Sequence, residues 1–421
     1  MRMKLISSVL TFAFFVHTVG HSQTFSSYSA LGIGNINNHA TVQHLSMGGL
    51  GISNGSYYYQ NTLNPSLLVD NQVYSFGGGL TFENKKILQG DNREVASGGT
   101  LSYLNMIIPV SPGKFVFSIG LFPYSNVNYN FKTDIPVLGN PDSEVVALSI
   151  GEGGFNQFVF KGAGKITENL YIGGEIAYLF SSISKEKNVT LVEPFGPYVP
   201  TSKTLITAND FVYSLGFVYR IPVNDDIKIS LGSTYGFSKD LTVTKFKTIQ
   251  TNSFAGTPIK IDTLLDNASG FISIPASYGI GISVAKLNNW MFGTDIKFQN
   301  WDNYRDFDGQ NNNLTSAMTI IVGGEITPNI SSFDNYFERI TYRFGFNYEN
   351  TPYIINNLQI EEFGINFGLS LPVTNFSSVD MGFRYGAQGT LKDNLIKESF
   401  TRIYFGFTFN DNRWFVRPKF N

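Results

Sequence analysis

The chain has 421 residues, and its 30 Lys and Arg against 32 Asp and Glu give a formal net charge of −2 at pH 7. This balance argues against nucleic acid as a partner, and the absence of cysteine excludes disulfides, thiol nucleophiles and thiolate metal sites. The chain combines 38 Phe, 22 Tyr and 42 Gly with only 15% charged residues, whereas an ordinary soluble domain has roughly 25%. This composition fits an outer-membrane β-barrel.

The first 22 residues have the pattern of a secretory signal peptide. A cationic start, MRMK, precedes the apolar run of residues 5–19, and GHSQT follows, where Ser22 can precede a cleavage site. The run is too short to span a membrane as a helix; the alternative is a buried N-terminal helix. We therefore expect the mature protein to start near Gln23, with 28 basic and 32 acidic residues. It would be exported to the outer membrane of a Gram-negative bacterium.

Residues 23–72 do not alternate between apolar and polar positions, and they are rich in Gly, Asn, Ser and Tyr. The stretch SYYYQNTLNPSLL contains Tyr57, Tyr58 and Tyr59, followed by the pair Asn64 and Pro65. Glycine and Asn-Pro supply turns, and aromatic side chains give a small segment something to pack with. We predict that residues 23–72 form a compact plug, called the hatch below, inside a barrel formed by residues 73–421.

From Val73 onward the dominant pattern has a period of two, as expected for strands that face lipid and lumen alternately. In RITYRFGFNYE, residues Tyr342, Phe344 and Phe346 share one face, and Arg343 and Asn347 share the other. KFVFSIGLF, NLYIGGEIAYLF, DIKISLG, VDMGFRYG and RIYFGFTFN behave in the same way. We count about fourteen such segments, each near the roughly ten residues that a tilted barrel strand needs. The predicted fold is an all-β, antiparallel transmembrane barrel.

Short and long connections alternate along the chain, as in barrels with short periplasmic turns and longer extracellular loops. The short connections cover residues 110–113, 165–169, 222–225, 286–289 and 373–377. The predicted long loops cover residues 84–96, 125–144, 185–203, 240–270 and 302–315. The periplasmic connection at residues 328–338 is longer than this rule predicts. The alternative architecture is a soluble β-sandwich or propeller, which should carry more surface charge than this chain does.

Three stretches resemble the FadL family of outer-membrane channels for long-chain fatty acids and other hydrophobic compounds. They are MGGLGIS…NTLNPSLL at residues 47–68, IPASYGIGISVAKLNNWMFGTDIKFQNWDNYRD at 274–306, and TYRFGFNYENTP at 341–352. The first is similar to the family's glycine-rich hatch and its Asn-Pro-Ala motif, although Ser66 replaces the alanine. The resemblance implies a fourteen-stranded barrel, a hatch at its N-terminus and a lateral exit beside the third strand, where Gly120 and Pro123 lie. The alternative is that Pro123 only ends this strand at the outer rim.

The resemblance also implies an extracellular capture site on the loops that join strands five to six and seven to eight. Here these loops contain the apolar residues Leu191, Phe195, Tyr198, Phe254 and Leu264. Strand parity separately places several charges in the lumen, including the cations Arg339, Arg343, Arg384 and Lys297. Two interpretations are open: these cations pair with lumen acids and the hatch, or one or two of them bind a ligand carboxylate.

Catalytic and cofactor motifs are weak. Residues 51–55, GISNG, match the Gly-x-Ser-x-Gly of serine hydrolases, but no histidine follows them. His39 and His44 lack a carboxylate set for a metal site, and KGAGKIT at residues 161–167 lacks the Ser or Thr of a phosphate loop. We expect no enzyme, cofactor or metal. The predicted partners are the outer-membrane bilayer and a hydrophobic small molecule; the alternative is a scaffold or carrier subunit that binds outer-membrane protein partners.

Overall fold

The computed structural model describes residues 25–37, 39–137, 140–191, 198–253, 257–374 and 377–411. The predicted signal peptide and the predicted capture residues Phe195 and Phe254 lie outside the described residues. In the described part of the chain, no helix is long and apolar enough to cross a membrane.

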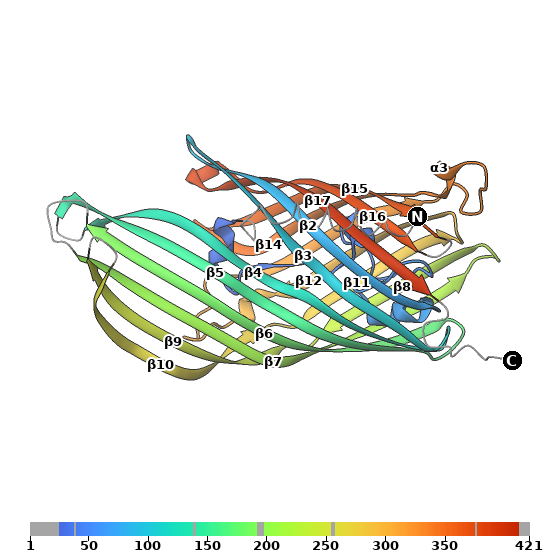
Figure 1. The fold of residues 1–421 in the computed structure, drawn as a ribbon, viewed down its shortest axis with the longest axis horizontal. Coiled ribbons are helices and arrows are strands. Elements are labelled where there is room, and N and C mark those ends of the chain that lie inside the picture. The colour runs from blue at the N-terminus through green and yellow to red at the C-terminus, as the bar shows by residue number, and fades with distance from the viewer. Residues whose placement is uncertain are drawn as a thin grey trace, which may run out of the picture.

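The strands after residue 73 form a closed antiparallel barrel of fourteen strands, as predicted (Figure 1). Strand β7 pairs with both β8 and β9, β11 pairs with β8, and β10 pairs with β9, so two barrel strands are each interrupted once. Pairing of β17 with β2 closes the barrel. The strands are β2 (Tyr74–Gln89), β3 (Asn92–Ser111), β4 (Phe115–Val137), β5 (Asn140–Lys165), β6 (Leu170–Leu191), β7 (Tyr198–Pro222), β8 (Ile227–Gly236), β9 (Lys239–Ser253), β10 (Pro258–Ile274), β11 (Ser277–Lys286), β12 (Trp290–Asn300), β13 (Ser316–Ile326), β14 (Thr341–Ile355), β15 (Leu358–Pro372), β16 (Ser378–Gly389) and β17 (Lys397–Asp411).

The period-two pattern predicts correctly which side chains face outward. On β14, Phe344 and Phe346 are exposed, whereas Arg343 and Asn347 are buried. On β4, Phe115 and Ile119 are exposed on one face, and buried residues occupy the other. The barrel therefore presents an apolar outer surface and a polar interior, which is the arrangement that lipid outside and hydrogen-bonding groups inside require.

The predicted short turns are confirmed at 112–114, 166–169, 223–226 and 287–289. The connection at 327–340 is long, and it includes the short helix α3 (Tyr336–Arg339). Most predicted extracellular loops, however, are wrong. Residues 84–96, 125–144, 185–203 and 240–270 are mainly paired strand in the described residues, and only 302–315 is a true loop, which begins in the 3-10 turn η4 (Trp301–Asn303). Polar strands above the membrane still satisfy their backbone groups in a ladder, so polarity alone did not distinguish loop from strand.

In the extracellular half of the barrel, the long hairpins separate from the neighbouring strands. Strands β3 and β4 pair only where residues 104–111 face residues 115–121. Strand β10 forms a ladder with β9, and its other edge makes one isolated bridge, from Ser273 to Arg305. Six strands, β4 to β7, β9 and β10, therefore project as one curved wall, and this wall reaches further than the remaining strands (Figure 1). We call the unpaired region between residues 92–103 of β3 and residues 122–137 of β4 the lateral breach.

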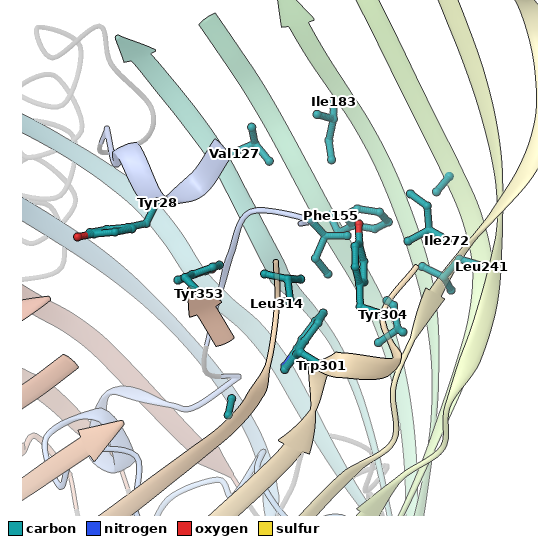
Figure 2. Packing of buried hydrophobic residues seen from close by; sticks show 14 of the residues in the cluster. Tyr28, Val127, Phe155, Ile183, Leu241, Ile272, Trp301, Tyr304, Leu314 and Tyr353 are labelled. Atoms are coloured by element: carbon teal, nitrogen blue, oxygen red, sulfur yellow. The ribbon is translucent and has the colours of Figure 1, made fainter. Parts of the chain in front are cut away.

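A hydrophobic core fills the space beside the wall (Figure 2). Val127, Phe155 and Ile183 of the wall face Tyr28 of the hatch and Tyr353 of β14, and the residues beyond the end of β12 complete it. The core's members from that side are Trp301, Tyr304 and Leu314. The extracellular half is therefore packed with side chains across the barrel.

Substituting Phe346→Arg tests the position of the membrane. Phe346 is 46% exposed on the outer face of β14, and arginine near the bilayer midplane costs about 2–4 kcal/mol. The free energy of unfolding in lipid vesicles, from guanidinium titration, should fall by that amount. The matched control is Leu264→Arg on β10, where the leucine is 51% exposed. We expect a much smaller loss there, and equal losses would contradict a wall that stands outside the membrane.

Candidate functional site

The hatch residues 25–72 lie within the barrel as a series of short elements. These are η2 (Ser27–Ala30), β1 (Asn35–Ile36), α2 (Val42–Leu45) and η3 (Pro65–Asp70). The Asn-Pro pair starts η3: the side chain of Asn64 accepts from the amide of Ser66 at 3.1 Å, and Pro65 occupies the first turn. Asn64 Nδ2 also donates to the carbonyl of Ile52 at 2.7 Å. The predicted turn residues therefore cap a helical turn and fasten it to the rest of the hatch.

Two glycines on barrel strands allow the hatch backbone to lie close to those strands. A Cβ at Gly173 would lie 2.4 Å from the backbone of Pro65, and a Cβ at Gly345 would lie 2.2 Å from the backbone of Met47. Real Cβ atoms do not come this close to backbone atoms. Any larger residue at either position would push the hatch away from the strand that carries it. These glycines are therefore needed for contact between the hatch and the barrel strands rather than for strand formation.

Polar groups of the barrel strands hold the hatch backbone. Asp295 Oδ2 on β12 accepts from the amides of Gly51 and Ile52 at 2.7 and 2.9 Å. Lys161 Nζ on β5 donates to the carbonyl of Thr62 at 2.6 Å. Because both charged groups are buried, each contact satisfies a lumen charge and a hatch backbone group together. Strands from two different sides of the barrel therefore hold the hatch in place.

The tyrosine run lies toward the periplasmic side of the hatch. Tyr59 donates to Glu325 Oε1 at 2.8 Å, and the guanidinium of Arg343 lies 4.9 Å from the centre of its ring. Tyr57 and Tyr58 contact each other edge to face at 5.3 Å between ring centres. All three line a cavity of about 1080 Å³ at the periplasmic mouth. The tyrosines thus form the roof of this periplasmic cavity.

The predicted lumen cations divide into three groups. Arg343 pairs with Glu325 at 2.9 Å, and Arg384 pairs with Glu362. The prediction that Arg339 lies in the lumen is wrong: it belongs to α3 in the periplasmic connection and stacks on a tyrosine of that helix. The reason is that this connection interrupts the period-two pattern from which its parity was counted. Lys297 has no carboxylate within 4 Å among the described residues. Ligand binding by any of the four stays a prediction.

A second cavity, of about 440 Å³, lies on the other side of the hatch. Thr100 and Ser102 of β3 line it, as do Tyr124 and Asn126 of β4, so it lies directly behind the lateral breach. Its polar side chains come from several strands and include Glu83, Lys85, Lys297, Glu349, Glu362, Arg384 and Arg402. We call it the upper cavity.

Strand β1 of the hatch occupies the breach. Asn35 and Ile36 pair with Asn126 and Ser125 on the free edge of β4. Ile36 is 39% exposed, although it belongs to the hatch. No sequence signal identified this two-residue strand, because its pairing depends on where β3 and β4 separate. The hatch is therefore a plug of the bore and also part of the barrel wall.

The described capture residues lie on strands of the wall. Leu191 is the last residue of β6, Tyr198 is the first of β7, and Leu264 lies in β10. The sequence placed all three in loops, which is wrong for the reason given above. Their predicted role in capturing a ligand stays a prediction.

His44 of the hatch is a buried, hydrogen-bonded residue. His44 Nδ1 lies 2.8 Å from Thr41 Oγ1, and its Nε2 lies 3.3 Å from Asn61 Nδ2, which can only donate. Burial lowers the pKa of His44 to about 3, so its ring is neutral. Ser53 of the GISNG stretch is buried in a loop of the hatch. Among the described residues, no group of three or more His, Cys, Asp and Glu could hold a metal ion.

The comparisons with known proteins agree with this architecture. A family model described as BamG matches residues 1–421. No curated protein sequence matches the chain. Solved structures with a similar fold include the CymD monoaromatic hydrocarbon channel, at 13% identity and a TM-score of 0.58, with 91% of this chain and 99% of that chain covered.

Two further solved structures share the fold. The Ralstonia pickettii toluene transporter TbuX has 15% identity and a TM-score of 0.56, with 89% of this chain and 99% of that chain covered. A Pseudomonas aeruginosa FadL homologue has 11% identity and a TM-score of 0.57, with 89% and 98% covered. At these identities the likeness shows the fold alone, so the FadL resemblance is confirmed at the level of the fold.

Substituting Asp295→Ala tests how the hatch is held. The change leaves two buried amides, those of Gly51 and Ile52, without an acceptor, and each unsatisfied group costs about 1–3 kcal/mol. Hydrogen exchange at these two amides should accelerate, while the barrel strands keep their protection. The control is Asp225→Ala in the exposed β7–β8 turn. Unchanged exchange at Gly51 and Ile52 would show that the hatch does not depend on this carboxylate.

Proposed function

We propose that this chain, which belongs to the BamG family because that family's model matches residues 1–421, is an outer-membrane channel for small hydrophobic compounds that carry a carboxylate. Long-chain fatty acids are the class that fits this description. The ligand passes through the lateral breach into the upper cavity, and movement of the hatch controls its onward passage. The route involves no catalysis and no cofactor.

The observation that carries the proposal is the position of the upper cavity behind the breach. Both free strand edges contribute to its lining, through Gly99 and Thr100 on one side and Tyr124 and Asn126 on the other. Its volume of about 440 Å³ falls in the range of roughly 300–1,000 Å³ that is usual for small-molecule sites. Since the hydrophobic core closes the extracellular half, access from the side is the shorter route.

The charges around the upper cavity favour an amphiphile over a neutral hydrocarbon. Arg384 and Arg402 are already paired with Glu362 and Glu83. Lys297 lines the same cavity, and its Nζ lies 3.5 Å from the carbonyl oxygen of Gly49. Asp295 and Glu349 are near enough to interact with it electrostatically. A ligand carboxylate that meets Lys297 would complete the pairing of the cavity's cations.

The solved structures with this fold support transport of hydrophobic compounds. One is a monoaromatic hydrocarbon channel, and another is a toluene transporter. In the present chain, charged side chains surround the upper cavity. For this reason the proposal names a ligand with a charged head and an apolar remainder.

A disulfide between β1 and β4 tests the route. The amide of Asn37 donates to the carbonyl of Tyr124, so the neighbouring pair Ile36 and Ser125 is a close, non-hydrogen-bonded pair, whose spacing suits a disulfide. The chain has no other cysteine. In the Ile36→Cys, Ser125→Cys variant, oxidation should stop uptake of labelled palmitate into cells, and reduction should restore it. The single variant Ile36→Cys controls for the loss of the isoleucine. Undiminished uptake by the oxidised double variant would rule out the breach as the route.

Substituting Lys297→Met tests the ligand class. Loss of a charge-assisted contact of about 1.5–3 kcal/mol should weaken palmitate binding by about tenfold or more. Binding of toluene should not change, because toluene has no carboxylate. Lys132→Met, on an exposed position of β4, is the matched control. Isothermal titration of the purified protein in detergent measures both ligands. An equal loss for palmitate and toluene would exclude Lys297 as the carboxylate site.

A scaffold or carrier role in an outer-membrane protein complex is the second candidate. The observation that favours it is the tight seal: the hatch is bonded to opposite walls and separates the two cavities. Native mass spectrometry of protein extracted gently from its own membrane separates the two candidates. A monomer with a small hydrophobic adduct supports the channel, whereas a larger assembly with an empty barrel supports the scaffold.

A further inference from the structure

Three cations lie together near the extracellular ends of three neighbouring strands. They are Lys397 of β17, Lys86 of β2 and Arg93 of β3. Leu88 of β2 is the partner of Lys397 on one side and of Arg93 on the other. Lys86 lies two residues before Leu88, and residues two apart on a strand share a face. The register therefore places the three cations in two adjacent rows, with Cα atoms within about 10 Å of one another. We call them the cationic patch.

The cationic patch lies on the outer face of the barrel. Ile87, which stands between Lys86 and Leu88, is buried inside the barrel, so the side chains on either side of it point outward. Further along the same face of β2, Phe82 and Leu80 are 41% and 37% exposed. The cations are therefore continuous with the apolar surface that meets the bilayer.

The level of the patch is the extracellular boundary of the membrane. The outer face of a transmembrane barrel has an apolar band about 25 Å tall, and its strands tilt by roughly 40°. With this tilt, Phe82 lies about 21 Å above Tyr74, where β2 begins. The apolar band ends near Asn84, and Lys86 is the next outward-facing residue on the strand. Lipid headgroups of the outer leaflet lie at this height.

None of the three cations has a carboxylate oxygen within 4 Å among the residues that the structure describes. Asp91 lies in the turn at the end of the β2–β3 hairpin, beyond the row of Arg93. Glu94 is the partner of Ile87, and it therefore belongs to the inner face. The patch is thus electropositive. The sequence placed Lys86 and Arg93 in a predicted loop, so their shared face could not be recognised from it.

We propose that the cationic patch binds the phosphates of an outer-leaflet lipid headgroup. Lipid A, a glycolipid with two phosphates and several acyl chains, has this chemistry. Arginine and lysine bind phosphate through charge-assisted hydrogen bonds, and basic side chains near a membrane surface attract anionic headgroups. The acyl chains would lie along the exposed apolar residues below the patch, namely Leu80, Phe82 and Leu101.

The bound lipid would stand beside the lateral breach. Strand β3 carries Arg93, and its residues 92–103 form one side of the breach. Leu101 lies on the outer face of this same stretch and is 39% exposed. A lipid held by Arg93, Lys86 and Lys397 would connect the unpaired part of β3 to two strands that are fully paired. The inference goes beyond the channel proposal, because it concerns the outer surface and does not depend on what passes through the breach.

Native mass spectrometry of the full-length protein in detergent, titrated with lipid A, tests the proposal. Lipid A should bind at least about tenfold more tightly than the same lipid after removal of both phosphates. Each cation near the membrane surface contributes about fivefold. Affinity should therefore fall by about a hundredfold in the triple variant Lys86→Gln, Arg93→Gln, Lys397→Gln, and by about fivefold in each single variant. Lys132→Gln, on an exposed position of β4, is the matched control and should leave the affinity unchanged.

A second triple variant separates charge from shape. Lys86→Arg, Arg93→Lys, Lys397→Arg keeps the three charges and should keep most of the affinity. The single variants carry the test if the first triple variant fails to fold. Equal affinity for lipid A and its dephosphorylated form would overturn the proposal, and so would undiminished binding by the glutamine variants. Inorganic pyrophosphate is the last probe: if it binds as tightly as lipid A, the ligand is a soluble phosphate and the assignment to a lipid is wrong.

Discussion

A barrel of fourteen strands encloses a bore that its own wall side chains cannot fill, and the rest of the structure depends on how this space is occupied. The hatch enters the bore as short turns and helical pieces, and its backbone groups need partners there. Buried charges on the strands need partners as well. Asp295 and Lys161 satisfy both needs, since each binds hatch backbone at the level of the barrel wall.

The same requirement explains the charge pairs of the lumen. Arg343 and Arg384 are buried, and each pairs with a glutamate, as a buried guanidinium group requires. Both interpretations of the lumen cations were open from the sequence, and pairing describes these two arginines. Lys297 lines the upper cavity as Arg384 does, but it has no carboxylate within 4 Å among the described residues. This difference is the basis for proposing Lys297 as the site of the ligand carboxylate.

The periplasmic and extracellular halves of the barrel differ in how many strands are long enough to reach them. Near the periplasm all fourteen strands pair around the barrel, but only six of them continue as the extracellular wall. The ends of this wall are free strand edges, and each edge has a different neighbour. Strand β1 of the hatch covers β4, and the loop after β12 touches β10 at one residue. One edge is thus joined to the interior of the barrel, whereas the other is open to the exterior.

Sequence alone determined the class of fold, the strand count, the facing of the strands and the periplasmic turns. These depend on local signals, namely period-two alternation and turn residues, which act over a few residues. Tertiary structure decided what depends on strand length and register: the breach, the covering role of Asn35 and Ile36, and the shared outer face of Lys86, Arg93 and Lys397. Polar strands that continue beyond the membrane look like loops in sequence, because their outer face meets water and not lipid. Only their pairing in long hairpins distinguishes them.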